Sequence, residues 1–203
     1  MQLADIPVPT TPAAVAAAEV LAHFSPPALV HHCHRSYLMA AALALEEGVA
    51  VDTELLYVAS LLHDLALEPA FDNHRLPFEE AGAHLAWVFT AGAGWPVERR
   101  HRAGAIIVAH MQGTDRAVDP EGDLLDLATG LDISGRNAER WPEALLAEIV
   151  GAYPRLDLAP RFIACFQDQA TRKPESSAAN AVRSGMVERI ANNPLETLPL
   201  HGR

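Results

Sequence analysis

The stretch that decides the fold reads Asp52-Thr-Glu-Leu-Leu-Tyr-Val-Ala-Ser-Leu-Leu-His63-Asp64-Leu65. Its apolar residues recur at steps of three and four positions, which indicates a helix with one face in the core. Asp52 stands where a helix N-cap is expected, and Glu54 follows in the first turn. The predicted helix therefore carries an imidazole and a carboxylate at its end, two groups that bind divalent metal ions.

Helical signals continue on both sides of this stretch, and strand patterns with a period of two residues are absent from the sequence. Prolines, glycines and N-cap residues divide the chain into successive helices. We expect a single all-α domain with a core over about 12–182 and an appended helix and tail over 183–203. The expected helices span about 11–23, 26–47, 52–65, 77–91, 96–110, 119–135, 142–153, 160–172, and a last stretch from 174 that breaks at Gly185.

The composition narrows the class of protein. A chain of 203 residues that is 50% hydrophobic buries a core without disulfides and is not disordered. Its 26 acidic and 15 basic residues give a net charge of −11, which disfavours nucleic acid and membrane surfaces as partners. Two distant cysteines and an N-terminus without a basic start predict a cytoplasmic protein. We expect a small-molecule substrate, and a homo-oligomer is left open.

The chain has ten histidines but only one lysine, Lys173. His32 lies in the helix before the decisive stretch, His63-Asp64 ends that stretch, and Asp132 lies far downstream. Neighbouring helical residues point about 100° apart, so His63 and Asp64 reach one ion only where their helix faces a cavity lined by other helices. The alternative interpretation of this dipeptide is a buried histidine paired with its neighbour.

The order of these motifs resembles the HD-domain superfamily of metal-dependent hydrolases, and within it the cyanamide-hydratase-like branch. The resemblance covers roughly residues 12–182 and implies a helical bundle with a metal site between helices in the core. The similar stretches are His32-x-x-Arg35-Ser-Tyr37, Leu61-Leu-His63-Asp64-Leu, Phe78-Glu79-x-x-Gly82-Ala83, Ala105-Ile106-x-x-x-His110, Leu131-Asp132-Ile133-Ser134-Gly135, Ala152-Tyr-Pro154-Arg155 and Arg172-Lys173-Pro174.

The resemblance implies a ligand set for one divalent metal ion. The family's ligands fall on His32, His63, Asp64 and Asp132, where His32 is chosen because it lies three residues before Arg35. Two imidazoles and two carboxylates suit zinc best, with iron or manganese as alternatives.

The number of ions depends on the fourth predicted helix. The dinuclear branches of the superfamily have a histidine where this chain has Phe78, so we expect one ion. His84 does not replace that histidine, because six residues place it about 240° further around the helix.

Four further residues are candidates for the chemistry. We expect His110 and Glu79 to move protons, and Arg35 and His84 to contact the substrate. Simpler interpretations exist, since the helix dipole favours a histidine at a helix end and a glutamate in a first turn. Arg35 equally suits an ion pair with an inner carboxylate.

The resemblance implies that water activated at the ion hydrates a small nitrile-like molecule such as cyanamide. The first alternative is a phosphohydrolase acting on a nucleotide or phosphomonoester, for which Arg35, Arg75 and Arg136 are the candidate basic residues. A di-iron oxygenase is disfavoured by Phe78. A non-catalytic sensor or scaffold that binds a metal is the remaining alternative.

Overall fold

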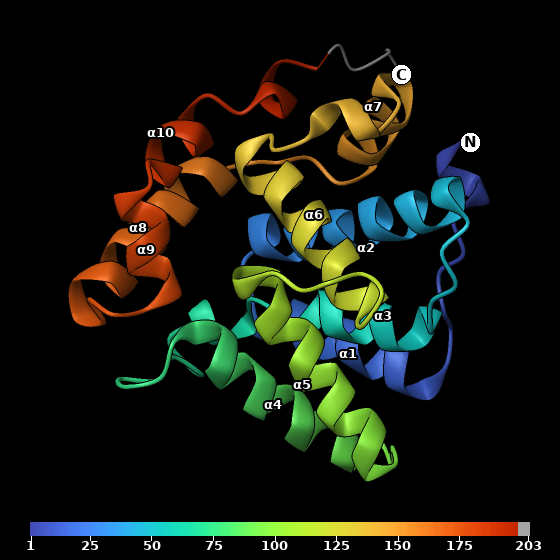
Figure 1. Ribbon diagram of the computed structural model, residues 1–203, viewed down its shortest axis with the longest axis horizontal. Coiled ribbons are helices and arrows are strands. Elements are labelled where there is room, and N and C mark those ends of the chain that lie inside the picture. The colour runs from blue at the N-terminus through green and yellow to red at the C-terminus, as the bar shows by residue number, and fades with distance from the viewer. Residues whose placement is uncertain (199–203) are drawn as a thin grey trace.

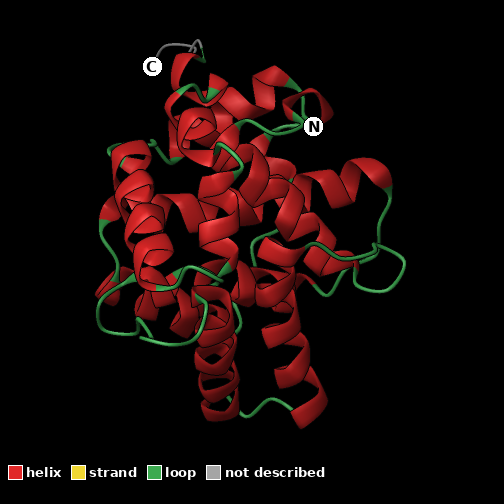
Figure 2. Ribbon diagram, turned by 60° about the vertical axis from the view of Figure 1, so that its left-hand side comes forward, coloured by secondary structure: helices red, strands yellow, loops and turns green. Residues whose placement is uncertain are grey.

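The computed structural model describes residues 1–198, and all regular structure within them is helical (Figures 1 and 2). The prediction of an all-α protein is confirmed. The α-helices are α1 (Pro12–Phe24), α2 (Pro27–Glu47), α3 (Thr53–Leu62), α4 (Phe78–Gly92), α5 (Val97–Gln112), α6 (Pro120–Ser134), α7 (Glu143–Ala152), α8 (Leu158–Arg172), α9 (Ser177–Arg183) and α10 (Met186–Ala191). Short 3-10 turns occur at Leu3–Asp5, Leu65–Leu67, Ala138–Arg140 and Pro194–Thr197.

The helix ends follow local signals in the sequence. The side chain of Asp52 accepts a hydrogen bond from the Leu55 backbone N–H at 3.0 Å, so Asp52 is the N-cap of α3 as predicted. Gly48 and Gly135 end α2 and α6 with positive φ angles of 65° and 71°. Glycine adopts this left-handed conformation without a steric penalty from Cβ, which explains why both helices stop there.

The core is built around α2, which packs against α3 and α6 at the centre of the molecule (Figure 1). Helices α4 and α5 form an adjacent hairpin, and α5 also packs against α3 and α6. Two glycines let these helices approach closely: a Cβ on Gly82 would lie 3.2 Å from the His63 carbonyl oxygen, and one on Gly104 would lie 3.4 Å from Ala83. The end of α3 is therefore enclosed by α2, α4, α5 and α6.

Helices α8, α9 and α10 gather on one side of this core (Figure 1). Lys173 ties the end of α8 to the loop that follows α3, because its Nζ lies 3.1 Å from Asp72 Oδ1 and 2.7 Å from Gln169 Oε1. The predicted break at Gly185 is confirmed, with a φ of 82° between α9 and α10. Residues 199–203 of the predicted tail lie outside the described residues.

Within residues 1–198, we find no helix whose length and apolar content would let it cross a lipid bilayer.

Candidate metal centre

The chain leaves the α-helical path at His63-Asp64. Helix α3 ends at Leu62, His63 keeps helical angles (φ −60°, ψ −36°), and Asp64 departs from them (φ −105°, ψ 3°). The prediction of a helix continuing to Leu65 is therefore wrong, since a 3-10 turn starts at that residue. This change of direction brings two adjacent side chains to one point, which the 100° spacing of a continuous helix would oppose.

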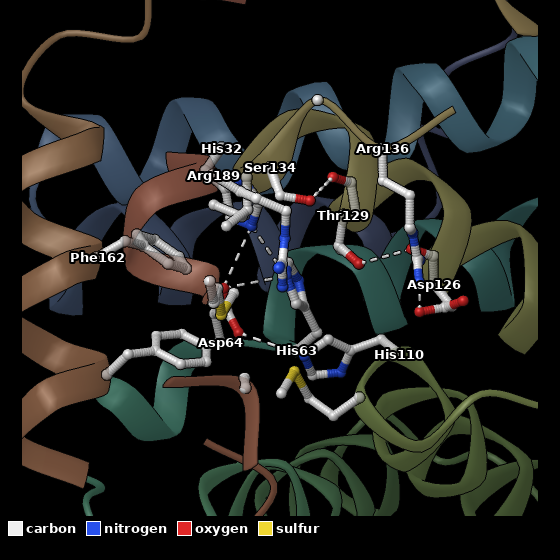
Figure 3. A pocket seen from close by; sticks show the side chains of 17 residues that line it. His32, His63, Asp64, His110, Asp126, Thr129, Ser134, Arg136, Phe162 and Arg189 are labelled. Atoms are coloured by element: carbon white, nitrogen blue, oxygen red, sulfur yellow. Dashed lines mark hydrogen bonds and ion pairs between the residues drawn. The ribbon is translucent and has the colours of Figure 1, made fainter. Parts of the chain in front are cut away.

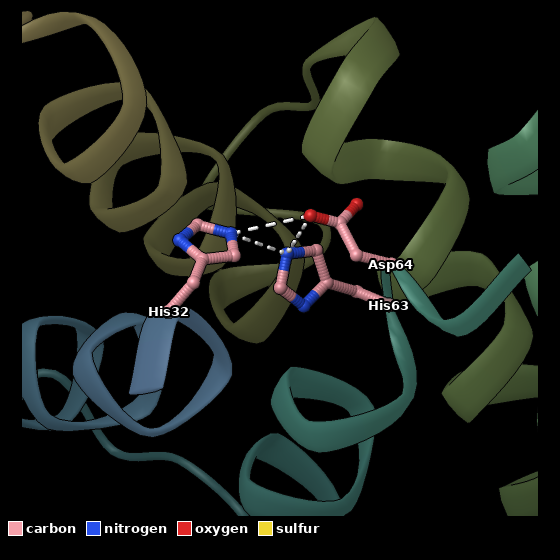
Figure 4. Close-up of side chains that lie close together, drawn as sticks. All are labelled: His32, His63 and Asp64. Carbon is pink, nitrogen blue, oxygen red and sulfur yellow. Dashed lines mark hydrogen bonds and ion pairs between the residues drawn. The ribbon is translucent and has the colours of Figure 1, made fainter. Parts of the chain in front are cut away.

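Three buried side chains converge there (Figure 4). The Nε2 atoms of His32 and His63 are 3.1 Å apart, and each lies 3.2 Å from Asp64 Oδ2. His32 comes from α2, on the opposite side of the site from the end of α3 (Figure 4). These groups can hold one metal ion, since two imidazole nitrogens and a carboxylate oxygen are common ligands of divalent transition metals.

The opposite ring nitrogens explain why the two Nε2 atoms are free for an ion. His63 Nδ1 donates a hydrogen bond to the Ser60 carbonyl oxygen at 2.7 Å, because a carbonyl only accepts. His32 Nδ1 donates to the Asp132 carboxylate at 2.6 Å. Each neutral ring then presents its Nε2 lone pair to the same point. Two lone pairs and an anionic oxygen in a buried space are the donor set that a cation requires.

The charges of the site agree with this interpretation. Burial would raise the pKa of Asp64, but the neighbouring His63, His110 and His32 hold that pKa well below its usual range. Burial lowers the pKa of His63, so its ring is neutral near pH 7 as a metal ligand must be. Burial alone would lower the pKa of His32, but hydrogen bonds to Asp132 and Asp64 outweigh burial and raise it. A metal ion would take the place of that extra proton.

Asp132, which the sequence predicts as a fourth ligand, lies apart from the three convergent side chains. Its Oδ2 is 2.6 Å from His32 Nδ1 and 2.7 Å from Arg35 Nη2, and its Oδ1 accepts from Arg35 Nε at 2.8 Å and Arg155 Nη1 at 3.0 Å. Both oxygens are thus occupied on the far side of the His32 ring. Burial would raise the pKa of Asp132, but the two guanidinium groups hold it well below its usual range. Asp132 is therefore an anion that orients His32.

His110 approaches the site from the end of α5. Its Nδ1 donates to the Ile107 carbonyl oxygen, and its Nε2 lies 3.6 Å from Asp64 Oδ1. The ring stands edge-on to His63, with 4.8 Å between the ring centroids. The structure therefore places His110 beside the three convergent groups, with Nε2 facing the Asp64 carboxylate.

A comparison with protein families matches residues 29–148 to the HD domain. The chain belongs to the HD domain family. Members of this family are in general metal-dependent hydrolases. The match includes His32, His63-Asp64, His110 and Asp132 and ends before α8. A comparison with curated proteins finds no match.

A pocket of about 580 Å³ opens at the site and is lined in part by His32, His63, Asp64 and His110 (Figure 3). Its walls combine residues of the HD-domain match with others from α8, α9 and α10, which lie outside it. Those from within the match, besides His32, His63, Asp64 and His110, are Met111, Asp126, Thr129, Gly130, Ile133, Ser134, Gly135 and Arg136; those from outside are Phe162, Phe166, Ala181, Met186 and Arg189.

Two predicted substrate contacts are not realised in this HD domain. Arg35 is fully buried and does not line the pocket, because its guanidinium binds Asp132 and donates to the carbonyl oxygens of Tyr153 and Pro154. It is the anchor of an inner carboxylate, which was the alternative interpretation. His84 is exposed on α4, away from the pocket.

Glu79 occupies an unusual position for a proton carrier. Its side chain is fully buried, it is not among the pocket-lining residues, and neither carboxylate oxygen has a hydrogen-bond partner within residues 1–198. The prediction of a catalytic role for Glu79 therefore gains no support from the pocket.

For several residues of the site, the sequence did not indicate the role that the structure shows. Phe162 and Phe166 are one turn apart on an amphipathic helix, a spacing that equally suits ordinary core packing. Arg155 stood in a stretch similar to the family, but its bond to Asp132 could not be inferred from spacing. Arg189 lies in no such stretch, so nothing pointed to it.

Proposed function

We propose that this HD-domain protein is a metal-dependent hydrolase or hydratase that holds one divalent metal ion through His32, His63 and Asp64. The convergence of two Nε2 atoms and a carboxylate oxygen at one buried point carries this proposal. Three protein ligands are also the number found in catalytic zinc sites, which keep a further position open. Zinc suits this donor set best, and iron or manganese are alternatives. Such an ion lowers the pKa of water from about 15.7 toward 7 and supplies hydroxide at neutral pH.

The chain's own residues would orient the ligands and move protons. Asp132, held by Arg35 and Arg155, fixes the His32 ring so that Nε2 faces the site. His110 Nε2 would accept the proton of the attacking water and return it to the product, because its Nδ1 is already committed to a backbone carbonyl. Phe162, which packs edge-on against His32 with 5.1 Å between ring centroids, limits the water around the ligands.

The first candidate substrate is a small nitrile-like molecule, which the resemblance to the cyanamide-hydratase-like branch supports. In that reaction, water adds across the carbon–nitrogen triple bond. The oxygen bonds to carbon, and both protons of the water end on nitrogen once the imidic acid that forms first has tautomerised to the amide. His110 would carry one of these protons.

The second candidate is a phosphomonoester or nucleotide. The pocket of about 580 Å³ is far larger than a molecule such as cyanamide requires, and the guanidinium groups of Arg136 and Arg189 line it. Arginine is well suited to bind phosphate because its fork of N–H groups matches the oxygens of the anion. The volume and the two arginines are the observations that favour this alternative.

One experiment separates these candidates from a sensor. Protein purified without added metals is analysed for bound elements, and is then assayed with zinc, manganese or iron against cyanamide, an aryl nitrile, aryl phosphates and nucleotides. Hydration without phosphate release supports the first candidate, and phosphate release supports the second. A bound ion with no turnover would support a sensor or scaffold and contradict the enzyme proposal. Asp64→Ala is the control, since it removes a proposed ligand.

A further inference from the structure

One arginine in the pocket wall has no acidic partner among residues 1–198. Arg189 lies on α10, and its side chain lines the pocket together with the candidate metal ligands (Figure 3). Its Nη1 donates to the Ser184 carbonyl oxygen at 2.7 Å, and within residues 1–198 no carboxylate lies within 4.0 Å of its guanidinium. The chain has 26 acidic and 15 basic residues, so this guanidinium stays unpaired despite an excess of carboxylates.

The other arginine of the pocket differs from Arg189 in this respect. Arg136 Nη2 donates to the carboxylate of Asp126 at 2.8 Å and to the carbonyl oxygen of the same residue at 2.6 Å. Its guanidinium lies directly over Gly130, where a Cβ would come within 2.4 Å of Nε. The positive charge of Arg136, which follows the end of α6, is thus neutralised by Asp126 of that helix. Arg189 is the cation of the pocket lining that no carboxylate of residues 1–198 neutralises.

The two carboxylates that line the pocket also have partners. Asp64 faces three imidazoles, and Asp126 faces Arg136. A ligand therefore meets one free positive charge, together with an apolar surface to which Phe162, Phe166 and Met186 contribute. A charge-assisted hydrogen bond from a guanidinium to an anionic oxygen is about twice as strong as one between neutral groups. The pocket is thus suited to a ligand with an apolar body and an anionic group.

Building on the proposed hydrolase function, we propose that Arg189 binds an anionic group, carboxylate or phosphate, of the substrate. The residue lies outside the part of the chain that matches the HD domain. Selection of the substrate would then come from α10, and the chemistry from the ligands on α2 and at the end of α3. A nitrile substrate would carry a carboxylate under this proposal, and an uncharged molecule such as cyanamide would bind without help from Arg189.

The test measures the binding of three ring compounds of similar size by isothermal titration calorimetry. Benzoate and phenylphosphonate carry an anion, and benzamide is neutral. The titrations use protein that has been stripped of metal and dialysed, so that anions cannot bind to an ion. The variants are Arg189→Met, Arg189→Lys and the matched control Arg75→Met. Arg75 was a candidate phosphate-binding residue in the sequence, but the structure places it outside the pocket, exposed and without a carboxylate partner within residues 1–198, so it serves as the control.

We expect at least one anion to bind better than benzamide and to lose about 10-fold or more in affinity in Arg189→Met. Arg189→Lys should recover part of the loss, and Arg75→Met should bind like the wild type. Tighter binding of benzoate assigns a carboxylate, and tighter binding of phenylphosphonate assigns a phosphate. Equal affinity for benzamide, unchanged binding in Arg189→Met, or no binding of either anion would overturn the proposal.

A separate measurement of metal content keeps the two proposals apart. Arg189→Met should hold the same amount of metal per chain as the wild type, because Arg189 contacts none of the proposed ligands through a hydrogen bond or ion pair in residues 1–198. A wild-type protein that binds anions but no metal would refute the hydrolase proposal and leave the anion site standing. A protein that holds metal but binds no anion would refute the role of Arg189 alone.

Discussion

Replacing Asp132 by asparagine separates an orienting residue from a metal ligand. The amide keeps the shape of the carboxylate but removes its charge. In the structure Asp132 accepts from His32 Nδ1 and from Arg35 and Arg155, and it is not among the three convergent ligands. We therefore expect Asp132→Asn to weaken metal binding without abolishing it.

The magnitude follows from these contacts. Loss of a residue that orients a metal ligand costs about 10- to 100-fold in metal affinity, or about 1.4 to 2.8 kcal/mol. Arg35 also loses its only carboxylate partner within residues 1–198 while fully buried, and breaking a buried ion pair costs about 3 to 5 kcal/mol of stability. For a chain of this size, that loss lowers the melting temperature by about 10 °C.

The assay is a competition titration of zinc against a chelator of known affinity, run beside a thermal melt followed by circular dichroism. The control is Asp126→Asn on the same helix, which removes the partner of Arg136 but touches no proposed ligand. Unchanged zinc affinity in folded Asp132→Asn would refute the orienting role. A loss as complete as that of Asp64→Ala would show that Asp132 is itself a ligand.

Three further predictions test the site and the fold. Asp64→Ala should lose metal and activity together while the protein stays folded, and elemental analysis that finds a full equivalent of metal would sink the proposed site. Removal of metal by a chelator should lower the melting temperature by about 5 to 10 °C where the free ion had been at about 100 times its dissociation constant, and readdition of zinc should restore it. Burial and the nearby His31 lower the pKa of His34 to about 4, below its usual 6.5, so the unfolded chain binds a proton there that the folded chain does not. The free energy of unfolding is therefore unaffected by His34 above pH 6.5. It falls as the pH drops toward 4, by about 1 to 2 kcal/mol after allowing for the exposed part of the ring. Urea unfolding of metal-free His34→Gln should show a flatter pH dependence in this range, unlike the exposed-site control His101→Gln.

Much of the fold could be predicted because its signals are local. Proline, glycine and N-cap residues act within one or two turns, so the α-helix boundaries come within a few residues of the observed ones. The convergence of His32, His63 and Asp64 was expected from the order of motifs on separate helices. The contact between Asp132 and His32 Nδ1 could not be expected, because motif order does not tell which ring nitrogen of His32 a carboxylate will meet. That outcome depends on Arg35 and on Arg155, whose guanidinium reaches Asp132 only through the tertiary fold.

The proposed metal ligands and Arg189 belong to parts of the pocket wall that differ in how tightly they are held. The proposed ligands lie on α2 and at the end of α3, where full burial and the interactions of Asp132 with Arg35 and Arg155 resist any change of position. Arg189 lies on the short helix α10, is exposed, and makes one side-chain hydrogen bond within residues 1–198. A substitution at Arg189 therefore disturbs few contacts, whereas one at Asp132 leaves buried charges without partners. Substrate preference should change through α10 at little cost in stability, while the metal centre stays the same.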